Sequence, residues 1–308
     1  MPVGSTRVST PLSNLAVQYR NTEYIFGDVF KDLMVTKESD MYWIWGNDFQ
    51  IPETLRANGA MSNRVTMGYS TSAYQVNEHA LKDVITERDR ENAVAPLNLD
   101  ADMTENLTDM IMRRMEYEGA KLIFTTTNWS NNATLVSSTS WKGHTTTAIA
   151  DLNVASATSV ILRASGKRAN TVVMGYNVLE GLKYNTNIFD RIKYSERAIV
   201  TEQLVAALFD VQNVYVGASI YDQAKEGATS SITFTWGGDA FIAYFDPSPG
   251  IKKATAALNF RVGWKGTPYR VKRWRDEDIE GDVIEVQTMC APRAVATSCA
   301  YLFKSVVL

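Results

Sequence analysis

Apolar residues recur at two different spacings along the chain, and each spacing predicts a different kind of element. From Asp102 to Leu122 the interval is three or four residues, which predicts an amphipathic helix of about five turns. Asp102, followed three residues later by Glu105, is the expected capping box at its start. Near its end, Glu116 and Glu118 oppose the helix dipole, and neighbouring basic residues offset them. The stripe fits a packed core better than a ligand site; it consists of Met103, Leu107, Met110, Ile111, Met115 and Leu122.

The segment from Arg191 to Gly250 combines helical and alternating patterns. Its first part predicts a helix with a stripe formed by Leu204, Val205, Leu208 and Phe209. Alternation around Tyr215 then predicts a strand. Two further alternating runs flank Gly237-Gly238, a pair that favours the positive φ angles of a tight hairpin turn. The runs are Ile232, Phe234 and Trp236 before the pair, and Phe241, Ala243 and Phe245 after it.

The first part of the chain predicts segments that need another surface. Residues 1–35 are rich in Ser, Thr and Asn at their start and predict an extended arm. Two strands are predicted by the run MYWIWG, which starts at Met41, and by the run RVTMGY, which ends at Tyr69. They are joined by a loose tip between Pro52 and Asn63. An isolated hairpin is only marginally stable in water, so we expect it to lie on something else.

The remaining elements make the fold class α+β, with one long helix against sheet. Strands are expected at residues 170–176, 260–264, 269–274, 283–290 and 301–307, and helices at residues 155–163 and from Val178 onward. Residues 129–150 are rich in Ser, Thr and Asn and predict a surface loop. His79 is expected where a strand passes into a helix.

Composition permits a large core and excludes few classes by itself. Apolar residues make up 45% of the 308 residues, charged residues 21%, and the formal charge is −3, so a strongly basic nucleic-acid binder is not indicated. Cys290 and Cys299 have no metal-binding spacing and are expected to be buried free thiols. No secretory signal pattern and no apolar run long enough for a membrane helix is seen, so we expect folding in a cytoplasm.

Motifs for catalysis or cofactor binding are missing from the sequence. The two histidines, His79 and His144, lie in no H-E-x-x-H motif, and no phosphate-binding glycine loop is present. Ser219 lacks the second glycine of a nucleophile elbow. We therefore predict no catalytic residue, no cofactor and no metal site, and no enzymatic activity.

Charge is unevenly distributed late in the chain. A basic run without any acidic residue extends from residue 252 to 275, and it is followed directly by an acidic run. Tyr269 and Trp274 interleave with the cations, which would suit nucleic-acid contact. The favoured interpretation is charge complementarity between neighbouring subunits or strands, because the adjacent carboxylates would repel phosphates. The basic residues are Lys252, Lys253, Arg261, Lys265, Arg270, Lys272, Arg273 and Arg275, and the acidic ones are Asp276, Glu277, Asp278, Glu280 and Asp282.

In order and spacing, these segments resemble the tailed-bacteriophage major capsid proteins of the Hong Kong 97 type over nearly the whole chain. The hairpin resembles the family's E-loop, and the capped helix resembles its spine helix. The strand and acidic connector that precede the spine helix in the family are resembled by YQVNEHALKDVITERDRENAVAP, residues 74–96. NTVVMGYNVLEGLKYN and WGGDAFIAYFDPSPG resemble parts of the axial domain. VIEVQTMCAPRAVATSCAYLFKSVV resembles the closing strands of the peripheral domain. None of these motifs is a strict signature.

The resemblance implies a domain plan. It places an N-terminal arm at residues 1–35, an E-loop at 36–75, a peripheral domain with the spine helix at 76–150 and 262–308, and an axial domain at 151–261. Contacts between subunits are then expected at aromatic and charged residues of the hairpin and of the late charged runs. These are Trp43, Trp45, Arg56, Arg64, Arg270, Lys272, Arg273, Arg275, Asp276, Glu277 and Asp278.

It also implies a function and partners. Hexamers and pentamers of the chain would form the icosahedral head shell around phage double-stranded DNA, which they would contact non-specifically. Assembly would take place in the host bacterial cytoplasm with separate scaffolding and portal proteins and an optional decoration protein. The product is a virion, and no membrane is involved.

Two departures from the family pattern lead to further expectations. Some members cross-link their shells through a lysine of the hairpin, but residues 40–75 contain no lysine. We therefore expect no such isopeptide bond and a shell held by non-covalent contacts or a separate cement protein. No long helical segment precedes the arm, so scaffolding is expected from a separate protein or from a pro-segment already removed.

Three other functions remain open from the sequence. A bacterial encapsulin shares the fold of this family but encloses cargo enzymes. A hydrolytic enzyme on an α+β fold and a nucleic-acid-binding module using residues 252–275 are the others.

Overall fold

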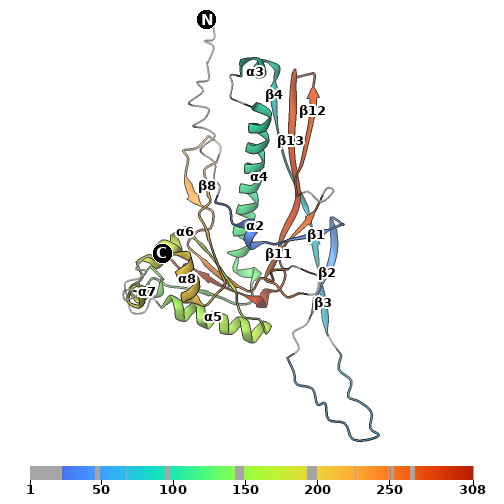
Figure 1. The fold of residues 1–308 in the computed structure, drawn as a ribbon, viewed down its shortest axis with the longest axis vertical. Coiled ribbons are helices and arrows are strands. Elements are labelled where there is room, and N and C mark those ends of the chain that lie inside the picture. The colour runs from blue at the N-terminus through green and yellow to red at the C-terminus, as the bar shows by residue number, and fades with distance from the viewer. Residues whose placement is uncertain are drawn as a thin grey trace.

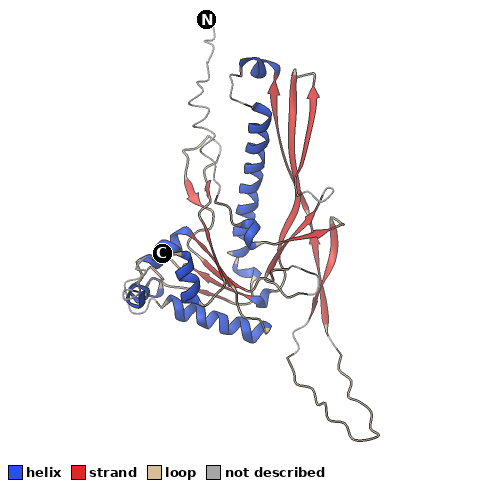
Figure 2. Cartoon of the chain, viewed as in Figure 1, coloured by secondary structure: helices blue, strands red, loops and turns tan. Residues whose placement is uncertain are grey.

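The computed structural model describes residues 23–45, 49–66, 68–93, 98–142, 149–192, 200–225, 227–248, 250, 253–263 and 268–307. The molecule is elongated (Figure 1). A long helix lies beside long strands at one end, a second sheet with most of the helices forms the other part of the body, and a hairpin projects away from the body (Figure 2). The predicted mixture of helices and strands is confirmed.

The long helix, α4, spans Leu99–Ile123, and Leu107, Ile111 and Met115 of its predicted stripe are buried. Met110, placed in the same stripe, is exposed, so the prediction is wrong for this residue. The predicted cap at Asp102 is wrong. Asn98 caps the helix instead, accepting a hydrogen bond of 3.4 Å from the backbone N–H of Ala101. Asn98 offers the same kind of capping oxygen one turn earlier, and the earlier start lets Leu99 pack on the sheet together with Met103.

The first sheet has the order β1 (Asp32–Val35), β11 (Ala257–Val262), β13 (Gly281–Ala294) and β12 (Arg270–Asp276), and β4 (Asn77–Thr86) also pairs with β13. Only β1 and β11 are parallel. Ile284 and Val286 of β13 pack under α4, so the long strand and the long helix stabilise each other. The short helix α3 (Glu87–Asn92) continues β4 at the far end. His79 lies within β4, so its expected position at a strand-to-helix junction is wrong.

The second sheet has the order β5 (Asn132–Thr134), β14 (Ala300–Lys304), β10 (Ala240–Ala243), β6 (Thr171–Gly175) and β7 (Asn213–Gly217). Alternate residues of its central strand β10 enter two different cores: Ile242 faces one, and Phe241 the other. The sheet is therefore buried on both faces, which accounts for its continuous apolar runs. Its helices are α5 (Ala150–Ser165), α6 (Tyr176–Lys183), α7 (Thr186–Ile192) and α8 (Glu202–Phe209).

Shorter elements complete the chain. The helix α2 (Phe26–Val29) precedes β1, and the strands β2 (Ser39–Trp45) and β3 (Tyr69–Gln75) form the hairpin. Of the predicted strand RVTMGY, the described residues 64–66 and 68 lie outside any strand, and only Tyr69 belongs to β3. β8 (Ile220–Asp222) and β9 (Ile232–Phe234) form a separate two-stranded sheet. The 3₁₀ turns are η1 (Thr126–Asn128), η2 (Ser137–Thr139) and η3 (Thr297–Cys299).

Two predictions for turns and loops are corrected. Gly237 has a φ of 51° and does form a turn, but the flanking strands do not pair: β9 pairs with β8, whereas β10 lies between β6 and β14. Burial on both faces of the second sheet decides the partners of β10. Residues 129–150 are more than a surface loop, because β5 pairs with β14 and the side chains of Trp129 and Trp141 are buried.

Sheet membership does not follow the expected domain ranges throughout. All of β11 except Val262 lies within residues 151–261, but the strand pairs in the first sheet. β5 and β14 lie in the ranges expected for the peripheral domain but pair in the second sheet. The domain boundaries stay a prediction.

Candidate assembly surfaces

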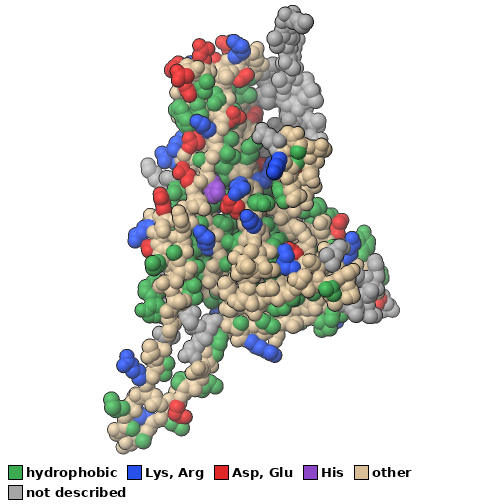
Figure 3. Space-filling model, turned by 180° about the vertical axis from the view of Figure 1, so that it is seen from behind, with side chains coloured by type: hydrophobic (Ala, Val, Ile, Leu, Met, Phe, Trp, Pro, Cys, Tyr) green, Lys and Arg blue, Asp and Glu red, His purple; other side chains and the backbone are tan. Residues whose placement is uncertain are grey.

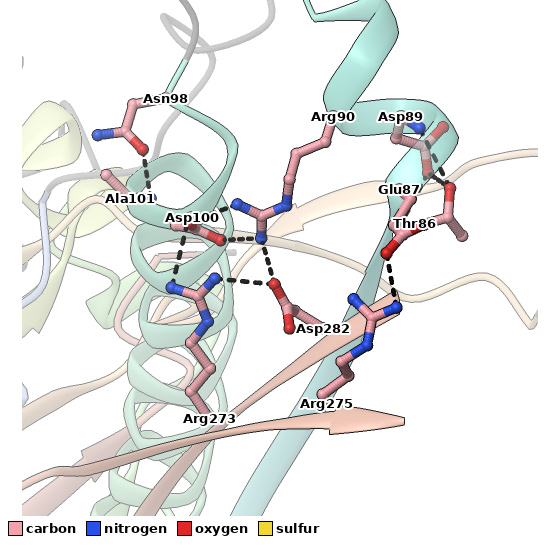
Figure 4. Close-up of polar contacts among 10 residues, drawn as sticks. All are labelled: Thr86, Glu87, Asp89, Arg90, Asn98, Asp100, Ala101, Arg273, Arg275 and Asp282. Atoms are coloured by element: carbon pink, nitrogen blue, oxygen red, sulfur yellow. Dashed lines mark hydrogen bonds and ion pairs between the residues drawn. The ribbon is translucent and has the colours of Figure 1, made fainter. Parts of the chain in front are cut away.

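Two arginines and two carboxylates hold the far end of the first sheet to α4 (Figure 4). Arg90 of α3 binds Asp100 of α4 through both terminal nitrogens, at 2.8 and 3.1 Å, and Asp282 of β13 at 2.8 Å. Arg273 of β12 binds the same two carboxylates, Asp282 at 2.8 Å and Asp100 at 3.4 Å. The hydrogen bond from Arg273 is the main reason that the pKa of Asp282 is lowered. The cluster joins α3 and α4, which are neighbours in sequence, to β12 and β13, which come much later in the chain.

Arg275 extends this ionic surface towards the end of the molecule. It donates to Glu87 at 2.5 Å and to Glu277 at 2.7 Å, and both carboxylates raise its pKa. In the adjoining turn, the backbone N–H of Asp278 donates to the side chain of Asp276 at 3.1 Å. Acidic side chains gather at this end (Figure 3). Exposed ion pairs contribute little each, so the cluster fixes geometry more than it adds stability.

Most described cations of the basic run have a carboxylate partner in the same chain. Lys272 lies 3.5 Å from Glu285, Arg261 2.8 Å from Asp32, and Lys253 3.1 Å from Asp246. Arg270 starts β12 and is exposed, and Lys252 and Lys265 lie outside the described residues. These pairs support the interpretation that the charges fix the register of strands rather than bind phosphates. The expected contacts with neighbouring subunits stay a prediction.

The hairpin exposes apolar side chains both along its strands and in its connecting loop. Trp43 of β2 packs edge-to-face on Tyr69 of β3, with ring centroids 4.8 Å apart. Trp45 ends β2, and its side chain lies outside the described part. In the connecting loop Arg56 donates to Ser62 at 3.0 Å, and Arg64 is exposed. Most of the large apolar residues here face solvent; they are Met41, Trp43, Phe49, Ile51, Leu55, Met61, Val65 and Tyr69.

The base of the hairpin is held firmly, in contrast to its loop. The rings of Tyr74 and Phe260 stack with centroids 4.6 Å apart and an interplanar angle of 2°, and Tyr42 lies 5.4 Å from the same phenylalanine. Tyr74 also donates to the carbonyl of Lys37 at 3.3 Å. An anchored base with an exposed apolar loop is the arrangement of an element that covers a second surface.

Sequence reasoning missed the junction at Glu116, which it treated as an end-of-helix surface charge. The side chain is completely buried and accepts hydrogen bonds from the backbone N–H groups of Ile25 and Phe26, at 3.0 and 2.9 Å, and from Trp236 Nε1 at 2.6 Å. Burial raises its pKa, while these donors act in the opposite direction. Gly119 was the available signal, because a glycine inside a helix indicates close approach of another element.

The described residues provide nothing that resembles a catalytic centre. They contain no group of three or more His, Cys, Asp or Glu that could hold a metal ion. Both cysteines are buried and free as predicted, and burial raises the pKa of Cys290 to about 11, which disfavours the reactive thiolate. His144 lies outside the described residues. Within the part of the chain that is described, no helix has the length and apolarity needed to cross a membrane.

Comparison with known proteins shows which proteins the whole chain resembles. No family model matches the chain. The major capsid protein of Burkholderia phage BcepMu is 27% identical over 306 residues, which cover 97% of this chain and 96% of the relative. The major capsid protein of Pseudomonas phage JBD67 is 25% identical, covering 78% and 77% of the two chains. The chain is a relative of phage major capsid proteins. Its role is therefore structural, in a capsid shell, and not enzymatic.

Solved structures agree with this relationship at the level of the fold. A phage-related protein from Bordetella bronchiseptica gives a TM-score of 0.74 at 20% identity, over 97% of this chain and 98% of that one. The capsid of cyanophage P-SCSP1u gives 0.57 at 10% identity, over 91% and 88%. The encapsulin of Synechococcus elongatus gives 0.54 at 8% identity, over 94% and 90%. The chain therefore shares its fold with phage capsid proteins and with an encapsulin.

Proposed function

We propose that the chain self-assembles into hexamers and pentamers that form the icosahedral head shell enclosing phage double-stranded DNA. The observation that carries this proposal is the projecting hairpin, whose loop exposes Ile51, Leu55 and Met61 almost completely. Such a loop is a liability in a monomer, but in a lattice it can be buried on a neighbouring copy. The phage relatives support a shell of this kind.

The fold also supports the parts of the proposed plan. α4 would be the spine helix of the peripheral domain, the β2–β3 hairpin the E-loop, and the second sheet with its helices the axial domain near the centre of each capsomer. The N-terminal arm would lie on a neighbouring subunit. An interface formed by both the arm and the hairpin on neighbouring subunits would exceed the standard size of protein–protein interfaces.

The proposed shell is held without covalent links from the hairpin, since residues 40–75 have no lysine. Separate scaffolding and portal proteins, and a decoration protein where one is present, would take part in its formation in the host bacterial cytoplasm. Most described cations of the basic run are paired with carboxylates of the same chain and are not free to bind phosphates. We therefore expect contact with DNA to be non-specific.

Electron microscopy of the purified chain, alone and co-expressed with its neighbouring genes, tests the proposal. Closed shells built of capsomers are expected. A chain that stays monomeric under both conditions would overturn the proposed function.

An encapsulin-type shell is the second candidate, favoured by the likeness in fold to the Synechococcus protein. The content of the particles separates the two. Nuclease-protected double-stranded DNA inside particles from infected cells supports the phage head, whereas an enclosed enzyme in place of DNA supports the encapsulin.

A further inference from the structure

A tight turn in the hairpin loop contains a pair of residues that can react with each other in water. Asn58 and Gly59 form the only Asn-Gly pair in the sequence of 308 residues. The carbonyl of Ala57 accepts a hydrogen bond of 3.1 Å from the backbone N–H of Ala60, and the φ of Gly59 is 81°. A φ of about +80° at the third residue is typical of a type II turn, so the pair occupies the two central positions of this turn.

Both groups that would react are open to water. Residues 51–66 are all exposed, and the loop projects from the body (Figure 1). The hydrogen bonds made by the described side chains of the loop do not include the amide of Asn58. Among the described residues, the backbone N–H of Gly59 also has no hydrogen-bond acceptor. A Cβ added at Gly59 would meet nothing within 4 Å, so no neighbouring group hinders movement at this position.

The chemistry of this pair is loss of ammonia followed by addition of water. Once the N–H of Gly59 has given its proton to hydroxide, the nitrogen attacks Cγ of Asn58. The N–Cγ bond forms, the Cγ–Nδ2 bond breaks, and Nδ2 takes up a proton from water and leaves as ammonia, so that a succinimide remains. Water then opens the ring at either carbonyl and gives aspartate or isoaspartate at position 58. Glycine favours the attack because it has no side chain beside the nitrogen and leaves the backbone free to rotate.

We propose that Asn58 is a site of spontaneous deamidation in the free chain, with water as the co-reactant and a succinimide as the intermediate. This inference does not depend on the proposed shell function. Glu53, Arg56 and Arg64 give residues 49–66 a formal charge of +1, and the new carboxylate brings it to 0. Isoaspartate also adds a methylene group to the main chain within the turn. The loop of a free chain therefore changes in charge and in backbone length as the chain ages.

Incubation of the purified full chain at neutral and at mildly alkaline pH, followed by trypsin and mass spectrometry, tests the proposal. Trypsin releases residues 57–64, ANGAMSNR, which contain Asn58 together with Asn63 as an internal reference. Asn63 is followed by an arginine, and its amide donates to the carbonyl of Glu53 at 2.9 Å. We expect deamidation at Asn58 and an unchanged Asn63. The reaction should be faster at the higher pH, where the N–H loses its proton more often, and isoaspartate should be among the products.

Gly59→Ala places a side chain beside the reacting nitrogen and should slow the reaction severalfold. Gly27→Ala is the matched control, because its added Cβ also meets nothing within 4 Å but lies outside the loop, and it should leave the rate unchanged. An intact Asn58 in the folded chain overturns the proposal. So does equal deamidation of Asn58 and Asn63, an unchanged rate in Gly59→Ala, or a product that contains no isoaspartate. None of these results bears on whether the chain forms shells, so the proposed function is tested separately.

Discussion

Glu116 shows how one side chain joins three distant parts of the chain. Its carboxylate accepts hydrogen bonds from two backbone N–H groups at the start of α2. It also accepts one from the side chain of Trp236, which lies in the turn before β10 of the second sheet. Nearby, Tyr24 donates to Asp109 of the same helix at 2.8 Å, and burial followed by this bond raises the pKa of Tyr24 to about 12. α4 therefore holds residues 24–30 against the body of the same chain. The sequence analysis placed these residues in an extended arm that needs another surface, and this is wrong for residues 24–35, because α2 packs on α4 and β1 pairs with β11.

Replacing the carboxylate tests this junction. Glu116→Gln keeps the shape but presents an N–H₂ group to donors, so at least one buried donor loses its partner. We expect a loss of about 1–3 kcal/mol in the free energy of unfolding, measured with urea. Glu118→Gln is the matched control on the same helix, where one partly exposed ion pair with Arg114 is worth less than about 1 kcal/mol. Equal effects of the two variants would contradict the role of Glu116.

The thiols give a prediction that depends on pH. Since burial raises the pKa of Cys290 to about 11, its thiol stays protonated at neutral pH and is also shielded from reagents. Iodoacetamide at pH 8 should modify neither Cys290 nor Cys299 in the folded chain, and both after unfolding in urea. Modification is measured by mass spectrometry. Rapid modification of the folded chain would contradict the burial of these two thiols.

At the scale of elements, packing decides between opposing effects at Gly119. Alanine at this position in α4 would gain up to about 1 kcal/mol in helix propensity. Its Cβ, however, would meet the rings of Phe26 at 2.7 Å and Phe30 at 2.9 Å. Overpacking of this kind costs about 1–3 kcal/mol. The cost outweighs the gain.

We therefore expect Gly119→Ala to lower the melting temperature of the chain. Gly27→Ala is the control, because nothing lies within 4 Å of the added Cβ there; this variant should be neutral or slightly stabilising. A stabilised Gly119→Ala variant would mean that α2 does not pack on α4 as described.

The ion pairs of β12 make a prediction that separates packing from DNA binding. Arg273→Ala removes the links to Asp100 and Asp282 and should lower the melting temperature. The salt dependence of DNA binding by the chain should stay unchanged, because this arginine is already paired. Arg56→Ala in the hairpin loop is the control and should leave the melting temperature unaltered. A reduced salt slope for Arg273→Ala would favour the nucleic-acid interpretation.

The elements that the sequence predicts well are those whose pattern is local. The stripe of α4, apart from Met110, and the alternation in β7 follow directly from periodicity. Strand partners depend on contacts distant in sequence, so the Gly237-Gly238 turn was predicted correctly but its hairpin was not. Glu116 was missed for the same reason, since its donors lie far away in the chain.

On the scale of the whole molecule, the hairpin loop leaves large apolar side chains uncovered by the described part of the chain. The body has two sheets with well-filled cores, whereas the hairpin exposes large apolar side chains at a distance from them. We infer that the exposed apolar side chains of one copy are buried against another copy in an assembly. The relatives are named major capsid proteins, which is consistent with the head shell proposed above.

Cryo-electron microscopy of particles assembled from the purified chain tests the central claim most directly. The account predicts closed icosahedral shells of hexamers and pentamers in which the hairpin of each copy lies on a neighbour. A chain that remains monomeric at high concentration, with and without its neighbouring gene products, would contradict it.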